Sequence, residues 1–111
     1  MKVFSDDIGF TEGPVVCRDG AVAVTAIDRG QVAVSRGGAA SILAETGGGP
    51  NGLVAARDGY YVAQNGGVWP ATAQAAPGVQ KIDAAGRVSR VAGGMVAPND
   101  LAIGPDGLLY V

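Results

Sequence analysis

Short apolar runs alternate with polar and turn-forming residues along this chain, and the pattern recurs. Three stretches align without gaps: TEGPVVCRDGAVAV from residue 11, PNGLVAARDGYYVA from residue 50 and PNDLAIGPDGLLYV from residue 98. In each stretch a polar residue stands seven positions before an Asp-Gly pair; these residues are Glu12, Asn51 and Asn99. The chain is therefore built from an internal repeat.

The repeat unit is about 40 residues long and extends beyond the aligned stretches. The polar positions are 39 and then 48 residues apart, and QVAVSRGGAASILA from residue 31 matches VQKIDAAGRVSRVA from residue 79. The extra length of the second unit falls in GVWPATAQAAPG, residues 67–78, which we expect to be an inserted loop. That loop carries the single tryptophan, Trp69, and the sequence leaves open whether it covers a channel or caps the core.

Each unit contains four strand-like runs, which in the second unit span residues 52–57, 60–64, 79–83 and 87–91. Asp-Gly joins the first two runs and Ala-Ala-Gly the last two, and such residues suit the positive φ of tight hairpin turns. Four antiparallel strands in each repeat of this length are typical of a β-propeller blade. We predict an all-β fold with blade one at about residues 10–46, blade two at 50–94 and the start of blade three at 98–111.

Other folds explain the pattern less well. A β-sandwich would account for the strands but not for the polar residue that recurs in register. Helix is conceivable only at residues 39–46, where the repeat predicts strand. A propeller closes with about 4–8 blades, so we expect residues 1–111 to be a fragment that needs the remaining blades from a longer chain or from other copies.

Composition narrows the function classes. The chain has 48% hydrophobic residues and a net charge of −2 without a Lys/Arg cluster, which argues against nucleic-acid and anionic-membrane partners. It has no histidine, so a Ser-His-Asp triad and histidine-containing metal sites are excluded within these residues. Its single cysteine, Cys17, cannot form an internal disulfide, and we expect it to be a small buried hydrophobe. Neither a signal peptide nor an apolar run of membrane-spanning length is visible, which predicts a cytoplasmic protein.

Four motifs in order, FTEGPVV, ETGGGPNGLVAARDG, PGVQKIDAAGRV and PNDLAIGPDGLLYV, resemble the N-terminal part of the gluconolactonase/regucalcin (senescence marker protein) family. The resemblance covers essentially all 111 residues but about a third of a typical member. It implies a six-bladed propeller that opens small lactones with a divalent metal ion, usually Ca²⁺, in its central channel.

The resemblance assigns roles to the three repeated polar residues. Glu12 corresponds to a metal-ligand glutamate, and Asn99 to an asparagine that contacts substrate beside the metal. Asn51 corresponds to a pocket-lining asparagine one blade earlier. The remaining ligands, an asparagine and the aspartate thought to activate water, belong to later blades, so the catalytic residue is unknown here. Animal members carry an arginine where this chain has Ala97, which leaves a sugar-acid substrate in doubt.

The residue chemistry is compatible with these roles, although simpler roles stay open. Ca²⁺ takes 6–8 oxygen ligands, and such an ion can polarise a carbonyl and acidify bound water. Glu12 could instead be a solvated loop carboxylate, and Asn51 and Asn99 could cap turns. We expect Asp100 to be structural, because strand alternation points it away from its neighbour. Surface or hairpin-turn positions are expected for Asp19, Glu45, Asp58 and Asp106.

These observations predict the N-terminal part of a calcium-dependent lactone hydrolase that acts on a small-molecule substrate and is inactive as the isolated chain. Two alternatives stay open. One is a non-catalytic propeller that serves as a binding scaffold, and the other is a related metal-dependent esterase or phosphotriesterase-like hydrolase.

Overall fold

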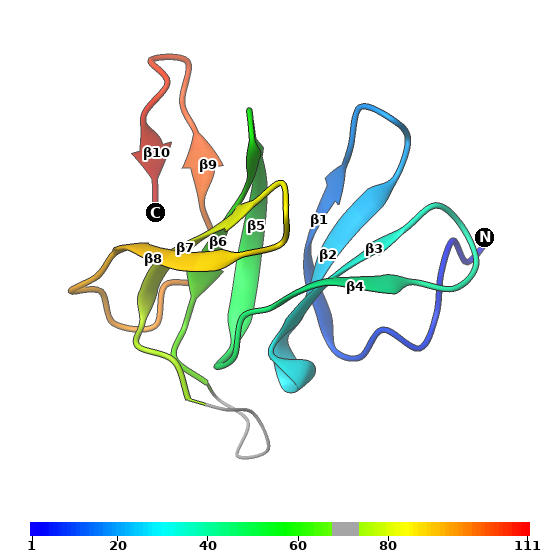
Figure 1. The fold of residues 1–111 in the computed structure, drawn as a ribbon, viewed down its shortest axis with the longest axis horizontal. Helices are drawn as coiled ribbons and strands as arrows, with labels where there is room; N and C mark the ends of the chain where they lie inside the picture. The colour runs from blue at the N-terminus through cyan, green and yellow to red at the C-terminus, as the bar shows by residue number, and fades with distance from the viewer. Residues whose placement is uncertain (68–73) are drawn as a thin grey trace.

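The computed structural model describes residues 1–67 and 74–111, and within them the chain is all-β apart from one short 3-10 helix (Figure 1). Two four-stranded antiparallel sheets are followed by a two-stranded hairpin. The first sheet comprises β1 (Thr11–Val16), β2 (Val22–Ala26), β3 (Gln31–Ser35) and β4 (Ser41–Glu45), with the helix η1 (Ile27–Arg29) between β2 and β3. The second sheet comprises β5 (Pro50–Ala56), β6 (Gly59–Gln64), β7 (Gly78–Asp83) and β8 (Val88–Ala92), and the hairpin comprises β9 (Ala102–Ile103) and β10 (Leu109–Tyr110).

The all-β prediction is confirmed, and the four runs expected in the second unit appear as strands whose ends differ from the prediction by at most two residues. Residues 41–45, where helix was conceivable, form β4. The short helix η1 was not expected from the sequence. It ends at Arg29 and is capped by Gly30, which has a left-handed backbone (φ 63°) and donates its N–H to the Ile27 carbonyl. The prediction for Trp69 falls outside the described residues.

The hairpin turns explain why each sheet folds back on itself. Asp19 and Asp106 each accept a backbone N–H two residues ahead through their carboxylates, at 3.1 and 3.0 Å. Asp83 does the same at the β7–β8 turn, where it accepts the N–H groups of Ala85 and Arg87. A short side chain that captures nearby N–H groups stabilises a tight turn. The aspartates of the Asp-Gly pairs therefore lie in turns, as the sequence predicted.

A continuous core joins the two sheets. It is formed by small and branched residues from both: Ala23, Val32 and Ala44 from the first, and Leu53, Val62 and Ile82 from the second. The other face of the second sheet packs, through Ala63 and Val79, on Leu101, Met95 and Leu109 from the segment that carries β9 and β10. The second sheet therefore has the first sheet on one face and the segment with β9 and β10 on the other, so the three units lie side by side in chain order (Figure 1).

The strands that begin the two units share a distortion. One extra residue interrupts the register of β1 against β2 between Glu12 and Val15, and another interrupts β5 against β6 between Pro50 and Leu53. Such bulges bend a strand and redirect side chains. Within the described residues no helix is long and apolar enough to cross a membrane.

Candidate functional site

The three repeated polar residues lie at corresponding ends of their units. Glu12 is the second residue of β1, Asn51 is the second residue of β5, and Asn99 lies three residues before β9. The hydroxyl of Thr25 lies 2.9 Å from the Glu12 carbonyl oxygen and 2.7 Å from that of Asn51. The N–H of Gly52 donates to the Asn99 carbonyl oxygen at 2.7 Å. The fold therefore brings the backbones of all three residues together, although they are 39 and 48 positions apart.

Glycines allow this close approach. A Cβ on Gly13 (φ +50°) would lie 2.6 Å from the Leu53 nitrogen and 2.8 Å from the Asn51 carbonyl oxygen. A Cβ on Gly52 would lie 2.7 Å from the Cα of Asp100. Real Cβ atoms do not tolerate backbone atoms at such distances. The glycine that follows Glu12 and the one that follows Asn51 are thus needed for each first strand to lie against the next unit.

The side chains of the three residues have different surroundings. Glu12 and Asn99 are exposed, whereas Asn51 is 9% exposed. The Asn51 amide makes no hydrogen bond with another described residue, and every fully buried side-chain N or O atom in the described chain has a partner. The Asn51 amide therefore keeps contact with solvent through the small part of the residue that is open. A buried residue with a solvent-facing amide is suited to meet a ligand.

The three repeated residues offer oxygen atoms of the kinds that bind a hard cation, with little net charge among them. Glu12 offers a carboxylate, and Asn51 and Asn99 offer amide oxygens, which are the ligand types that Ca²⁺ prefers. Among the described residues no group of three or more Cys, Asp or Glu side chains could hold a metal. A cation beside Glu12 would therefore depend on the amides and on further oxygens, with at most two carboxylates of the described residues in its set.

Neighbouring positions have structural roles. The Asp100 carboxylate accepts the N–H of Leu101 at 2.8 Å and packs against Gly52, which agrees with the expected structural role. Ala97, which stands where the resemblance would place an arginine, has a left-handed backbone with φ 49°. A side chain in that region carries a steric cost.

Sequence reasoning missed two buried polar residues next to the site. Thr25 and Gln64 are both fully buried, lie at the ends of β2 and β6 and, like Glu12 and Asn51, are 39 residues apart. They occupy equivalent places in the repeat. The signal that could have found them is a polar residue at one repeat position in the otherwise apolar runs AVAVTAI and YYVAQ.

Gln64 holds the chain that leads into Asn51. Its side-chain oxygen accepts the N–H groups of Gly49 and Gly66 at 2.7 and 3.0 Å. Its side-chain nitrogen donates to the Gly47 carbonyl at 3.0 Å and to the Gln80 side-chain oxygen at 3.1 Å. The Gln64 amide thus has partners for both of its N–H groups and accepts two hydrogen bonds at its oxygen. Two of these four partners, Gly47 and Gly49, belong to the loop before β5, so this loop is held in one position.

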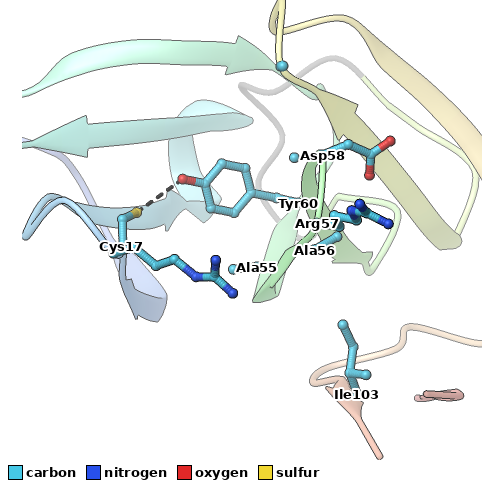
Figure 2. A pocket seen from close by; sticks show the side chains of 10 residues that line it. Cys17, Ala55, Ala56, Arg57, Asp58, Tyr60 and Ile103 are labelled. Carbon is cyan, nitrogen blue, oxygen red and sulfur yellow. Dashed lines mark hydrogen bonds between the residues drawn. The ribbon is translucent and has the colours of Figure 1, made fainter.

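A pocket of about 810 Å³ lies at the other end of the strands, near the Asp-Gly turns (Figure 2). Its lining includes Cys17 and Tyr60, whose Sγ and Oη atoms are 3.1 Å apart. Burial, together with the hydrogen bond to Cys17, raises the pKa of Tyr60 to about 12. Cys17 was expected to be a buried hydrophobe; it is half-buried instead, because its thiol reaches the edge of this pocket and meets a polar partner.

The ion pairs near this pocket are on the surface. Asp58 pairs with Lys81 at 2.7 Å and Asp19 pairs with Arg36 at 2.6 Å. The hydrogen bonds from Lys81 and Arg36 lower the pKa of the two carboxyl groups. Exposed pairs of this kind contribute little to stability. Asp19 and Asp58 therefore have structural partners at the turns, at the opposite end of the strands from Glu12.

Comparisons with known proteins add no family to this description. The sequence matches no protein-family model and no curated protein. What points to a function is the site itself, in which three polar residues recur at one repeat position and their backbones lie together.

Proposed function

We propose that this chain is part of a β-propeller lactone hydrolase that uses a divalent cation, with Ca²⁺ as the expected ion. Glu12 would hold the cation, and Asn51 and Asn99 would contact a small cyclic ester beside it. The proposal is supported by the resemblance to the gluconolactonase/regucalcin family and by one observation above all. At one end of the sheets the Thr25 hydroxyl links the Glu12 and Asn51 carbonyls, and the Gly52 N–H donates to the Asn99 carbonyl, so the polar residues of three successive units lie together.

The residues of this chain would bind and orient the substrate. The Asn51 amide can donate to a lactone carbonyl or ring oxygen, and its burial excludes much of the surrounding water. Because β1 and β5 belong to packed sheets, the groups that they carry are preorganised before a ligand arrives. When bound, a divalent cation would supply charge stabilisation for the developing oxyanion.

Calcium binding tests the cation part of the proposal. Isothermal calorimetry with CaCl₂ is expected to detect saturable binding by the 111-residue chain in the range of weak sites, about 0.1–1 mM. Glu12→Gln removes the carboxylate and is expected to weaken binding at least about tenfold. Glu45→Gln is the matched control, because Glu45 is an exposed carboxylate paired with Gln31. Equal affinity in Glu12→Gln and the parent chain, or no binding at all, would overturn the cation site.

Substrate contact is tested by nuclear magnetic resonance. A panel of lactones, simple esters and phosphotriesters is added to ¹⁵N-labelled chain with and without CaCl₂. The Asn51 side-chain amide is expected to shift with lactones only when calcium is present. A response limited to phosphotriesters would favour that hydrolase class, and no response to any ester would favour a binding scaffold. The isolated chain is expected to hydrolyse none of them, so chelator-sensitive lactone turnover by the monomer would contradict that expectation.

A further inference from the structure

Thr25 occupies an unusual place between the two sheets. It is fully buried near the end of β2, directly opposite Glu12 in the β1–β2 register. Its hydroxyl lies within hydrogen-bond distance of two carbonyl oxygens, those of Glu12 (2.9 Å) and Asn51 (2.7 Å). A hydroxyl has one proton to donate, so the two carbonyls share it in a three-centre hydrogen bond.

The next pair of units is joined in a different way. Between the second and third units the backbone N–H of Gly52 donates to the Asn99 carbonyl. Between the first and second units the described backbone groups of β1 and β5 form no such bond. The Thr25 hydroxyl therefore makes the link between Glu12 and Asn51 that a backbone N–H makes between Gly52 and Asn99.

We propose that Thr25 is a positioning residue that sets the spacing of Glu12 and Asn51 through this shared hydrogen bond. The inference rests on the proposed function, because it assigns Thr25 a role in the same cation and substrate site. Thr25 touches neither ligand: it acts through the backbones of the two residues that do. Gly13 leaves no Cβ between the strands, so their separation depends on what the hydroxyl holds in place.

A binding site needs its groups held within about 0.5 Å of the productive geometry. Both Glu12 and Asn51 lie next to bulges, where ladder hydrogen bonds are interrupted and the backbone has fewer constraints of its own. Without the hydroxyl, the two carbonyls lose their common donor and β1 can move relative to β5. Loss of the hydroxyl therefore lowers the affinity of the site for its cation more than it lowers the stability of the rest of the fold.

The test compares Thr25→Val, Thr25→Ser and Ser35→Ala. Valine keeps the shape and removes the hydroxyl, and serine keeps the hydroxyl. Ser35→Ala is the matched control, because Ser35 is a buried strand residue whose hydroxyl accepts the Gly37 N–H at the distant end of the first sheet. Calcium affinity is measured by calorimetry, and amide hydrogen exchange at Gly13 and Gly52 is measured on metal-free protein.

Thr25→Val is expected to weaken calcium binding about 10- to 100-fold, as is usual when an outer partner of a ligand is lost. It is also expected to speed exchange at Gly52, while Thr25→Ser and Ser35→Ala stay within about twofold of the parent chain. If the parent chain binds no calcium, the cation site fails, and the exchange data alone decide the positioning role. Unchanged exchange at Gly13 and Gly52 in folded Thr25→Val, or unchanged affinity, would overturn the inference. If Thr25→Val does not fold, failure of Thr25→Ser to retain both parent values would overturn it.

Discussion

At the scale of single residues, close packing of backbone decides which positions tolerate change. Gly13 illustrates this, because its left-handed backbone and the nearby Asn51 and Leu53 leave no room for a side chain. Gly20 also has a left-handed backbone (φ +83°), but no atom lies within 4 Å of where its Cβ would be. A substitution at Gly20 therefore carries only the cost of the left-handed conformation, whereas one at Gly13 also carries the cost of a clash between the sheets.

Gly13→Ala is expected to lower the free energy of unfolding by about 3 kcal/mol or more. About 1–2 kcal/mol comes from the left-handed conformation, and overpacking adds a further ~1–3 kcal/mol. Gly20→Ala carries only the first cost and serves as the control. Urea denaturation of the two variants measures the difference. Equal loss of stability in both would show that β1 and β5 do not depend on the close approach at Gly13.

Tyr60 makes stability depend on alkaline pH. Its pKa is raised to about 12 from the ordinary value of 10.0, with burial as the main cause. The folded protein therefore favours the neutral phenol. The resulting stabilisation of the folded state is fully present below about pH 10 and is lost as the pH rises towards 12. Two pKa units correspond to about 2.7 kcal/mol, and since Tyr60 is half-buried we expect a loss on the order of 1 kcal/mol.

Melting temperatures between pH 9 and about 11.5 measure this effect. The parent chain is expected to lose stability over that range, and Tyr60→Phe is expected to lose less because it has no phenol to ionise at this place. Tyr61→Phe is the control and is expected to follow the parent. An identical pH profile for Tyr60→Phe would show that ionisation of Tyr60 does not cause the alkaline loss of stability.

At the scale of elements, repeat-equivalent buried polar residues connect strands to the loops at the site end. Thr25 links strands of two sheets directly, and Gln64 links β6 to the Gly47–Gly49 loop and to Gln80 on β7. Gln80 in turn donates to the Thr46 carbonyl at 3.1 Å. Such satisfied networks specify one arrangement of the loop, because any other arrangement leaves buried groups without partners.

Gln64→Leu is expected to lower the free energy of unfolding by about 3 kcal/mol or more. Leucine fills a similar volume but strands several buried partners, each at about 1–3 kcal/mol. Gln31→Leu is the control, because Gln31 is half-buried and its one side-chain bond goes to exposed Glu45; a change within about 0.5 kcal/mol is expected there. Thermal denaturation measures both. A loss below 1 kcal/mol in Gln64→Leu, on the scale of ~1–3 kcal/mol for one stranded group, would mean that the loop finds other partners.

At the scale of the elements, local patterns were also what the sequence predicted best. Alternating apolar residues and Asp-Gly pairs identified the strands and turns, since both depend on neighbours within a few positions. The bulges after Glu12 and Pro50 and the short helix at Ile27–Arg29 were missed, because the hydrophobic pattern marks strands but neither a single extra residue in their pairing nor a helix of three residues. The roles of Glu12, Asn51 and Asn99 stay predictions.

At the scale of the whole molecule, the units differ in how well they are covered. The second sheet is packed on both faces, whereas the β9–β10 hairpin has strands of two residues and exposes Ile103 and Tyr110. Central strands such as β6, which pair on both sides, have their N–H groups in ladders that open only with the sheet. Local stability follows burial and hydrogen bonding.

Hydrogen exchange is expected to follow this order. The N–H groups of β6 and β7 should exchange at least about 100-fold more slowly than those of β9 and β10. Mass spectrometry or magnetic resonance can measure both sets in one sample, with intrinsic rates as the reference. Equal protection in the hairpin and the central strands would show that the third unit is as firmly held as the second.

The repeat, the strands and the turns can be read from the amino-acid sequence alone, because each depends on spacing and on the preferences of adjacent residues. Packing of the sheets brings the backbones of Glu12, Asn51 and Asn99 together through the Thr25 hydroxyl and the Gly52 N–H. The same packing buries Asn51 and leaves the other two residues exposed. Their hydrogen-bond partners lie in other strands and other units. Such contacts arise when sheets pack, which is why Thr25, an ordinary residue in an apolar run, acquires its place between two strands of the site.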